Sequence, residues 1–345
     1  MKEREINFMT ISSNIYFPYV NFTAKQLMKF YPSCNFFIYD WGLTPPQKRK
    51  LKSYPISRLI DWYDKIDWEF GYKKIKNIDG LPPHLKRNKD LLYLLNQKPV
   101  CMLDCAKRIK ENLIYFDGDA ILINPIDEIF EDNYDIGITI LDEDLLNRSF
   151  EDLEILKKYM MGDINSGVIF FKSSSKYIQL FIQEWLNEIE ISKRPDHFSL
   201  INLIKDRVKD IFKKSYNIRK ITLSNTEFKI KAFPASIYNY FRIYDGYDDK
   251  KVKFLHFIKP PPRNKGSPAT VVRDFIIEMK FRYIYFNFLK LFPLRIKNSI
   301  RRIFRYRLLL YLIKYPLEFN WIVYVFFKII SNAKKEFLKK DKKIY

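Results

Sequence analysis

Short apolar runs alternate with longer amphipathic stretches along the first three quarters of the chain. Runs of about four to eight apolar residues are typical of buried strands, whereas apolar positions three and four residues apart are typical of helices that pack on one face. The pattern predicts strands at 6–11, 34–39, 57–62, 112–116, 134–141, 165–171 and 253–258. Helices are expected at 17–31, after 44–46, and at 91–110, 125–130, 174–190 and 198–211. Strands that alternate with helices indicate an α/β fold with a mostly parallel central sheet flanked by helices.

Prolines mark several of the predicted boundaries. Pro32 ends the first helix, and Thr44-Pro45-Pro46 supplies an N-cap residue and a first-turn proline for the next one. The triple proline at 260–262 ends the last strand, because proline has no N–H to donate to a ladder. Residues 63–90 are polar, aromatic and irregular, and we expect them to form a loop over the site.

Composition narrows the kinds of site that the chain can carry. Its 345 residues, 47% of them hydrophobic, can form a substantial core, but nine glycines leave little for glycine-rich loops, and neither a dinucleotide fingerprint nor a P-loop is present. The three cysteines, Cys34, Cys101 and Cys105, form no CxxC pair, which argues against a disulfide framework or a zinc ribbon. A reducing, cytoplasmic setting is therefore expected. The start of the chain has no apolar export signal, so we expect no export.

Positive charge is concentrated at the end of the chain. Of the net charge of +21, residues 281–345 contribute 16 Lys and Arg against three acids. Aromatic residues and leucines interleave with these charges, and the charges interrupt every apolar stretch before it could span a bilayer. The segment predicts an amphipathic helical appendage that lies on an anionic membrane surface. A helical cap with a solvated basic face is the alternative; nucleic acid has no recognition motif to support it.

Asp117-Gly118-Asp119 directly follows the predicted strand 112–116. Taken alone, such a triplet reads as a solvated turn, since Asp and Gly are both turn residues. Its position changes this interpretation, because ligands of open α/β sheets bind beyond the carboxyl ends of the strands. Two carboxylates one residue apart can hold a hard divalent cation, Mn²⁺ or Mg²⁺, against the oxygens of a diphosphate.

Two stretches resemble GT-A-type glycosyltransferases, most closely the family-eight group that includes lipopolysaccharide galactosyl- and glucosyltransferases. Residues 112–119, Asn-Leu-Ile-Tyr-Phe-Asp-Gly-Asp, are similar to that family's strand and metal-binding DxD, and 36–43 are similar to its second strand and Asp-x-Gly-Leu turn. The resemblance covers 5–262. It implies a GT-A-like fold and a nucleotide-diphosphate sugar donor, with Thr10, Ser12 and Asp40 near the nucleotide. For Asp40 an ordinary turn aspartate is the alternative.

Further segments of the resemblance supply the sugar side of the site. Residues 163–168 are similar to the family's Asn-Ser-Gly-Val segment, which implies donor-sugar contacts by Asp163, Asn165 and Ser166. Residues 195–202 are similar to its Asp-Gln-x-x-Leu-Asn pattern and imply a catalytic role for Asp196 and His197, which we assign together with Asn165. His197 stands where the family has glutamine, so the stereochemical outcome stays open. A plain strand entry at 165 and a solvated loop at 197 are the alternatives.

The last predicted strand carries the remaining candidates. Residues 254–260 resemble a shortened form of the family's His-x-x-Gly-x-x-Lys-Pro-Trp, without its glycine and tryptophan. The resemblance implies that His256 completes the metal site and that Lys259 holds phosphate; a core histidine at a strand end is the alternative. Lys98 and Asp142 fall where related enzymes place sugar or acceptor contacts.

These observations predict a catalytic domain at 1–265 and a basic, aromatic tail at 266–345. We expect a metal-dependent hexosyltransferase that uses Mn²⁺ or Mg²⁺ and a sugar nucleotide. Its acceptor would be a glycan or a lipid-linked glycan, reached at the cytoplasmic face of a membrane, with no specific nucleic acid as partner. A nucleotidyltransferase is the main rival, although the glycine-rich triphosphate loop is missing near the first strand. A non-catalytic membrane- or RNA-binding protein on a transferase scaffold is the other.

Overall fold

The computed structural model describes residues 5–63, 89–142, 145, 164–205, 207–208, 215–241 and 250–257. The chain divides into two compact units, Met1–Ala269 and Thr270–Tyr345, and every described residue belongs to the first. The functions predicted for the two parts of the chain remain predictions. Among the described residues, no helix combines the length and the apolar character that crossing a membrane requires.

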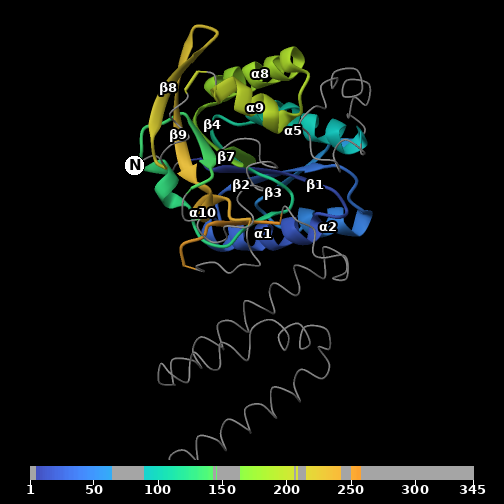
Figure 1. Cartoon of the computed structure of the whole chain (residues 1–345). Helices are drawn as coiled ribbons and strands as arrows, with labels where there is room; N and C mark the ends of the chain where they lie inside the picture. The colour runs from blue at the N-terminus through green and yellow to red at the C-terminus, as the bar shows by residue number, and fades with distance from the viewer. Residues whose placement is uncertain are drawn as a thin grey trace, which may run out of the picture. The chain divides into compact units, whose positions relative to one another are not determined.

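An eight-stranded sheet runs through the first unit in the order β3-β2-β1-β4-β7-β6-β9-β8 (Figure 1). The strands are β1 Asn7–Ser12, β2 Asn35–Asp40, β3 Ser57–Asp61, β4 Glu111–Phe116, β6 Ile136–Ile140, β7 Ile164–Ser174, β8 Ile218–Leu223 and β9 Thr226–Pro234. Of these described strands, β7 and β8 run opposite to the others. The predicted α/β class and mostly parallel sheet are thus confirmed.

Helices cover both faces of the sheet (Figure 1). One face packs on α1 Phe17–Phe30 and α2 Pro45–Lys52, and the other on α5 Lys89–Arg108, α8 Ser175–Ser192 and α9 Asp196–Lys205. Strand β1 shows how the sequence produces this layering. Phe8 packs in the core on the side of α1 and α2, and Met9 packs in the core on the side of α5, α8 and α9. Because successive side chains of a strand point to opposite faces, a strand covered on both faces reads as a continuous apolar run.

A small antiparallel sheet joins two distant parts of the chain. Strand β5, Ala120–Leu122, follows the aspartate pair and pairs with β10, Phe254–His256. In this register His256 lies opposite Ala120, and the N–H of Phe257 donates to the carbonyl of Asp119 at 3.0 Å. The pairing therefore places His256 beside the carboxylates, although the sequence separates them widely.

Most predicted elements are present, with shifted bounds. Helix α9 begins at Asp196 and ends at Lys205, and the predicted helix at 125–130 is the 3-10 helix η2, Asp127–Phe130. Strand β5, the β8–β9 hairpin and the short helix α10, Ala235–Tyr238, were not predicted. Residues 64–88 lie outside the described residues, so the loop expected over the site stays a prediction.

Candidate active site

Asp117-Gly118-Asp119 forms the turn between β4 and β5. The N–H of Asp117 donates to the carbonyl of Gly167 on β7 at 2.8 Å, and the N–H of Ala120 donates back to the carbonyl of Asp117 at 2.9 Å. A Cβ at Gly118 would overlap the carbonyl oxygen of Ile11. The middle position of the triplet is therefore restricted to glycine by close packing against the end of β1.

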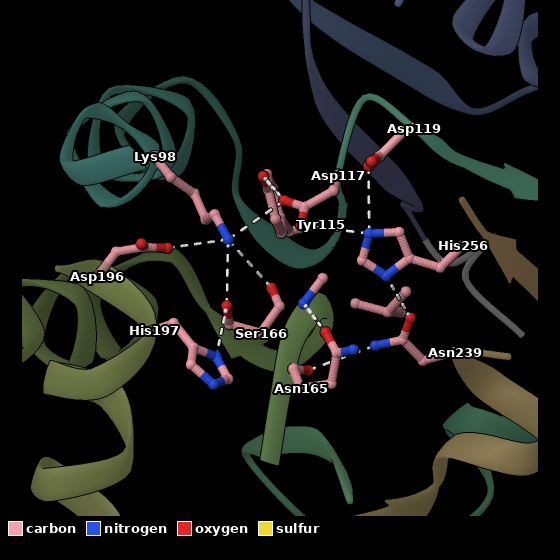
Figure 2. Close-up of polar contacts among 12 residues, drawn as sticks. Lys98, Tyr115, Asp117, Asp119, Asn165, Ser166, Asp196, His197, Asn239 and His256 are labelled. Atoms are coloured by element: carbon pink, nitrogen blue, oxygen red, sulfur yellow. Dashed lines mark hydrogen bonds and ion pairs between the residues drawn. The ribbon is translucent and has the colours of Figure 1, made fainter. Parts of the chain in front are cut away.

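The two carboxylates and His256 converge on one point (Figure 2). His256 Nε2 lies 3.2 Å from Asp119 Oδ1 and 3.6 Å from Asp117 Oδ2. One ligand atom from each residue lies within 4.8 Å of the other two. Two carboxylates and one imidazole are a donor set that suits Mn²⁺, and Mg²⁺ when water or phosphate oxygens complete the shell. The residues present fit the divalent cation that the sequence predicted.

Lys98, which α5 projects into the site, offsets part of the negative charge in this cluster. Its Nζ lies 3.2 Å from Asp117 Oδ1 and 2.9 Å from Asp196 Oδ2, and its side chain is 6% exposed. Burial lowers the pKa of Lys98, but Asp117 and Asp196 outweigh it, so the net pKa is raised. With His256 neutral, three carboxylates face one ammonium group, and a divalent cation would neutralise the excess.

Neighbouring charges also act on Asp117 and His256, two of the three candidate metal ligands. Burial raises the pKa of Asp117, but Lys98 and His256 outweigh this effect, so the pKa lies below its ordinary value. Burial lowers the pKa of His256, but the negative charges of Asp119 and then Asp117 raise it by more, so the net pKa lies above its ordinary value. Asp117 is consequently held as the carboxylate that a metal ion requires.

Tyr115 is a site residue that the sequence did not indicate. It lies on β4, two residues before Asp117 and on the same face of the strand, and its hydroxyl donates to Asp117 Oδ1 at 2.5 Å. The sequence suggested only a buried strand residue at this position. Tyr115 and Lys98 together hold Oδ1 of Asp117, which leaves Oδ2 for the side of His256.

The residues predicted to contact the sugar lie on the other side of Lys98 (Figure 2). Ser166 Oγ lies 3.2 Å from Lys98 Nζ and 3.3 Å from His197 Nδ1, and Asp196 and His197 begin α9. The side chain of Asn165 accepts from the N–H of Gly167 at 2.8 Å. The structure thus brings Asn165, Ser166, Asp196 and His197 together beside the aspartate pair.

A second missed residue, Asn239, lies behind His256. Its Oδ1 is 2.9 Å from His256 Nδ1, and it is fully buried. Asn239 follows α10 in a part of the chain for which the sequence predicted no element. A lone asparagine outside any motif gives no sequence signal, so only the tertiary structure could reveal this contact.

The residues predicted near the nucleotide lie at the ends of β1 and β2. Asp40 Oδ1 accepts from the N–H groups of Gly42 and Leu43 at 2.9 and 2.7 Å, and its Oδ2 pairs with Lys48 at 2.5 Å. These contacts match the alternative interpretation, an aspartate that shapes its own turn. Ser12 lies opposite Asp40 in the sheet register. Thr10 is buried, and its hydroxyl has no hydrogen-bond partner in the described part of the chain.

The three remaining predicted residues are Asp142, Asp163 and Lys259. Asp142 accepts hydrogen bonds from the N–H and the hydroxyl of Ser236, at the first turn of α10. Asp163 and Lys259 lie outside the described residues. Their predicted sugar and phosphate contacts remain predictions.

Comparison with known proteins gives matches at the level of structure. No protein-family model matches the sequence, and no curated protein matches it. Among solved structures, the galactosyltransferase LgtC in complex with donor and acceptor sugar analogs is 14% identical, with a TM-score of 0.45, over 79% of this chain and 94% of that one. The glycosyltransferase GlyE of Streptococcus pneumoniae TIGR4 is 13% identical, with a TM-score of 0.44, over 77% and 57%. The bifunctional glycosyltransferase WbbM is 11% identical, with a TM-score of 0.43, over 75% and 46%.

Proposed function

We propose that this protein is a metal-dependent glycosyltransferase of the GT-A type, which moves a hexose from a nucleotide-diphosphate sugar to a glycan or glycolipid acceptor. The observation that carries the proposal is the convergence of Asp117, Asp119 and His256 beyond the carboxyl end of β4. This is where ligands of open α/β sheets bind. The family resemblance at 112–119 and 254–260 supports the same assignment.

Each side of the site has a distinct task in this proposal. When bound, a divalent cation held by Asp117, Asp119 and His256 would neutralise charge on the departing nucleotide diphosphate. Lys98 and Tyr115 orient Asp117, and the resemblance assigns Lys259 to the phosphates.

Sugar binding is assigned to the residues beyond Lys98. Asp196 is 1% exposed, and its Oδ1 has no hydrogen-bond partner among the described residues. A buried carboxylate oxygen without a partner costs free energy, which a sugar hydroxyl would relieve by donating to it. Ser166, which contacts Lys98, and His197, which follows Asp196 in α9, lie on this side of the site and would complete the sugar pocket together with Asn165.

The basic tail suggests where the acceptor is found. Residues 281–345 carry Lys and Arg among aromatic residues and leucines, a composition that favours anionic membrane surfaces. We therefore propose peripheral association with the cytoplasmic face of a membrane and a lipid-linked acceptor.

Hydrolysis of sugar nucleotides by the full-length protein tests the enzymatic proposal. A panel of sugar nucleotides is first screened by thermal shift with Mn²⁺, because a donor that binds the folded state raises its stability by mass action. For the donor selected, Asp119→Asn or a chelator is expected to lower the rate at least about 100-fold, the scale for loss of an electrostatic catalytic group. Glu227→Gln on the exposed surface of β9 is the matched control and should leave the rate unchanged. Full activity in Asp119→Asn, or with chelator present, would contradict the metal assignment.

A further inference from the structure

The contact between Asn239 and His256 has a consequence for metal binding. Asn239 Oδ1 meets His256 Nδ1 on the side of the ring that faces away from Asp117 and Asp119 (Figure 2). We infer that Asn239 is a positioning residue, which holds His256 in the tautomer and the orientation that present Nε2 to the metal. The inference rests on the proposed metal site and adds to it a residue that the family resemblance did not indicate.

Thr139 on β6 fixes which way the amide of Asn239 points. The hydroxyl of Thr139 donates its single hydrogen to the carbonyl of Asn165 at 2.7 Å. Toward Asn239 it can therefore only accept, and the atom facing it at 2.8 Å is Nδ2, a donor. The same Nδ2 lies 3.4 Å from the carbonyl of Asn165, which is also an acceptor. Both contacts leave the amide oxygen of Asn239 facing His256.

The amide oxygen in turn decides where the imidazole carries its proton. An amide oxygen only accepts hydrogen bonds, so His256 Nδ1 must be the protonated nitrogen. The lone pair of the neutral ring is then on Nε2, which lies 3.2 Å from Asp119 Oδ1. Metal-binding histidines are commonly fixed in this way by an acceptor on the second nitrogen.

Backbone hydrogen bonds keep the two side chains at this distance. The N–H of His256 donates to the carbonyl of Tyr240 at 2.8 Å, and the N–H of Tyr240 donates to the carbonyl of Phe254 at 2.9 Å. The N–H of Asn239 donates to the carbonyl of Ala235 at 3.1 Å. Asn239 therefore lies on a segment bonded directly to β10, and its amide is held in place before any metal arrives.

Mn²⁺ affinity of the full-length protein, measured by titration calorimetry or electron paramagnetic resonance, tests the inference. Asn239→Leu keeps the volume but removes the acceptor, and is expected to weaken Mn²⁺ binding by about 10- to 100-fold. Asn239→Asp retains an acceptor of the same shape and should restore much of the affinity. An unchanged Kd in folded Asn239→Leu would overturn the inference.

The matched control is Asn7→Leu. Asn7 is also fully buried, and its amide donates to the carbonyls of Glu111 and Asn112 at the opposite end of β4 from the aspartates. Thermal unfolding without metal measures how much each variant destabilises the fold. Asn7→Leu should destabilise the protein and leave its Mn²⁺ affinity unchanged. An equal loss of Mn²⁺ affinity in both variants would mean that Asn239 acts through stability alone.

Nitrogen-15 spectroscopy of the unmutated protein gives a second readout. The chain has three histidines, so histidine labelling gives few ring signals, and the His256→Gln variant identifies the one of interest. We expect a protonated Nδ1 at His256 both with Mg²⁺ and in metal-free protein at alkaline pH. A protonated Nε2 in the neutral ring would overturn the inference.

If the protein hydrolyses no sugar nucleotide while the ring-nitrogen signals and the Mn²⁺ affinities are as expected, the transferase proposal fails and the positioning role of Asn239 stands.

Discussion

Single residues in the site are constrained as much by the space around them as by their own chemistry. Gly167 on β7 lies against the ring of His256, and a Cβ added there would overlap ring atom Cε1. The same glycine also receives the backbone of Asp117 through its carbonyl. Gly167 therefore contacts both the His256 ring and the backbone of Asp117, and the ring can come this close because Gly167 has no side chain.

Gly167→Ala should displace the imidazole without removing any metal ligand. The added methyl group would force the His256 ring to move, and we expect Mn²⁺ affinity to fall at least about tenfold, in line with other changes to the support of a metal ligand. Titration of the variant with Mn²⁺ measures the effect.

Gly137→Ala provides the comparison. A Cβ at Gly137 would press on the ring of Phe233 in the core, and its three nearest atoms belong to Phe233 and Phe170 and to no candidate metal ligand. Overpacking of this kind costs about 1 to 3 kcal/mol of stability. Gly137→Ala should therefore lower the melting temperature and leave the affinity for Mn²⁺ unchanged. If Gly137→Ala and Gly167→Ala bind Mn²⁺ with equal affinity, the steric argument is contradicted.

Which site residues the sequence could indicate depends on where their partners come from. Asp117 and Asp119 are adjacent to a strand and form a motif, and His256 was found because its segment resembles one. Asn239 acts through contacts that exist only after β6 and β10 have assembled. Tyr115 contacts Asp117 only two residues along the chain, but it lies in an apolar run and looks like a core residue. Asn239 looks like a loop residue, so neither pattern indicated a role in the site.

Secondary structure shows a similar division between local and distant information. The strands that are buried on both faces, such as β1 and β4, carry consecutive apolar residues, as at Phe8-Met9 and Leu113–Phe116, and were predicted close to their observed bounds. The β8–β9 hairpin lies at one edge of the sheet and mixes Lys229 and Lys231 with apolar residues, which weakened its pattern. Strand β5 is three residues long and depends on β10 for its only pairing among the described strands, so its sequence alone could not indicate it.

The turn of the β8–β9 hairpin provides a test of this part of the fold. Ser224 and Asn225 join β8 to β9 with φ of 42° and 64°, a region that glycine adopts without steric cost. Asn225→Gly should therefore raise the free energy of unfolding by up to about 1 kcal/mol, the scale of backbone substitutions at such positions. Asn225→Val, which disfavours positive φ, should lower it. Chemical denaturation of both variants measures the difference, and a more stable valine variant would contradict the assigned turn.

The whole molecule combines a site with an excess of negative charge and a strongly basic end. Lys98 offsets part of the negative charge around Asp117, whereas the charge of 281–345 has few acids beside it in the sequence. Attraction of such a segment to anionic lipid amounts to about 1 kcal/mol per basic residue near the surface and is weakened by salt.

Removal of the tail should separate the two proposed activities. Full-length protein is expected to sediment with vesicles that contain anionic lipid at low salt and to be released at high salt. A variant that ends at residue 280 should lose this binding and retain sugar-nucleotide hydrolysis. RNA of equal charge in place of vesicles is the control. Preferential binding to RNA, or vesicle binding that survives the truncation, would contradict the membrane assignment.

The pairing of β5 with β10 also bears on how the protein is made. The two aspartates leave the ribosome long before His256, which lies near the end of the described chain. A nascent chain that stops before Phe254 has the carboxylates but neither the imidazole nor the strand that covers Ala120–Leu122. The proposed metal site can therefore become complete only when synthesis of this unit is nearly finished, and incomplete translation products should lack the proposed ligand that β10 supplies.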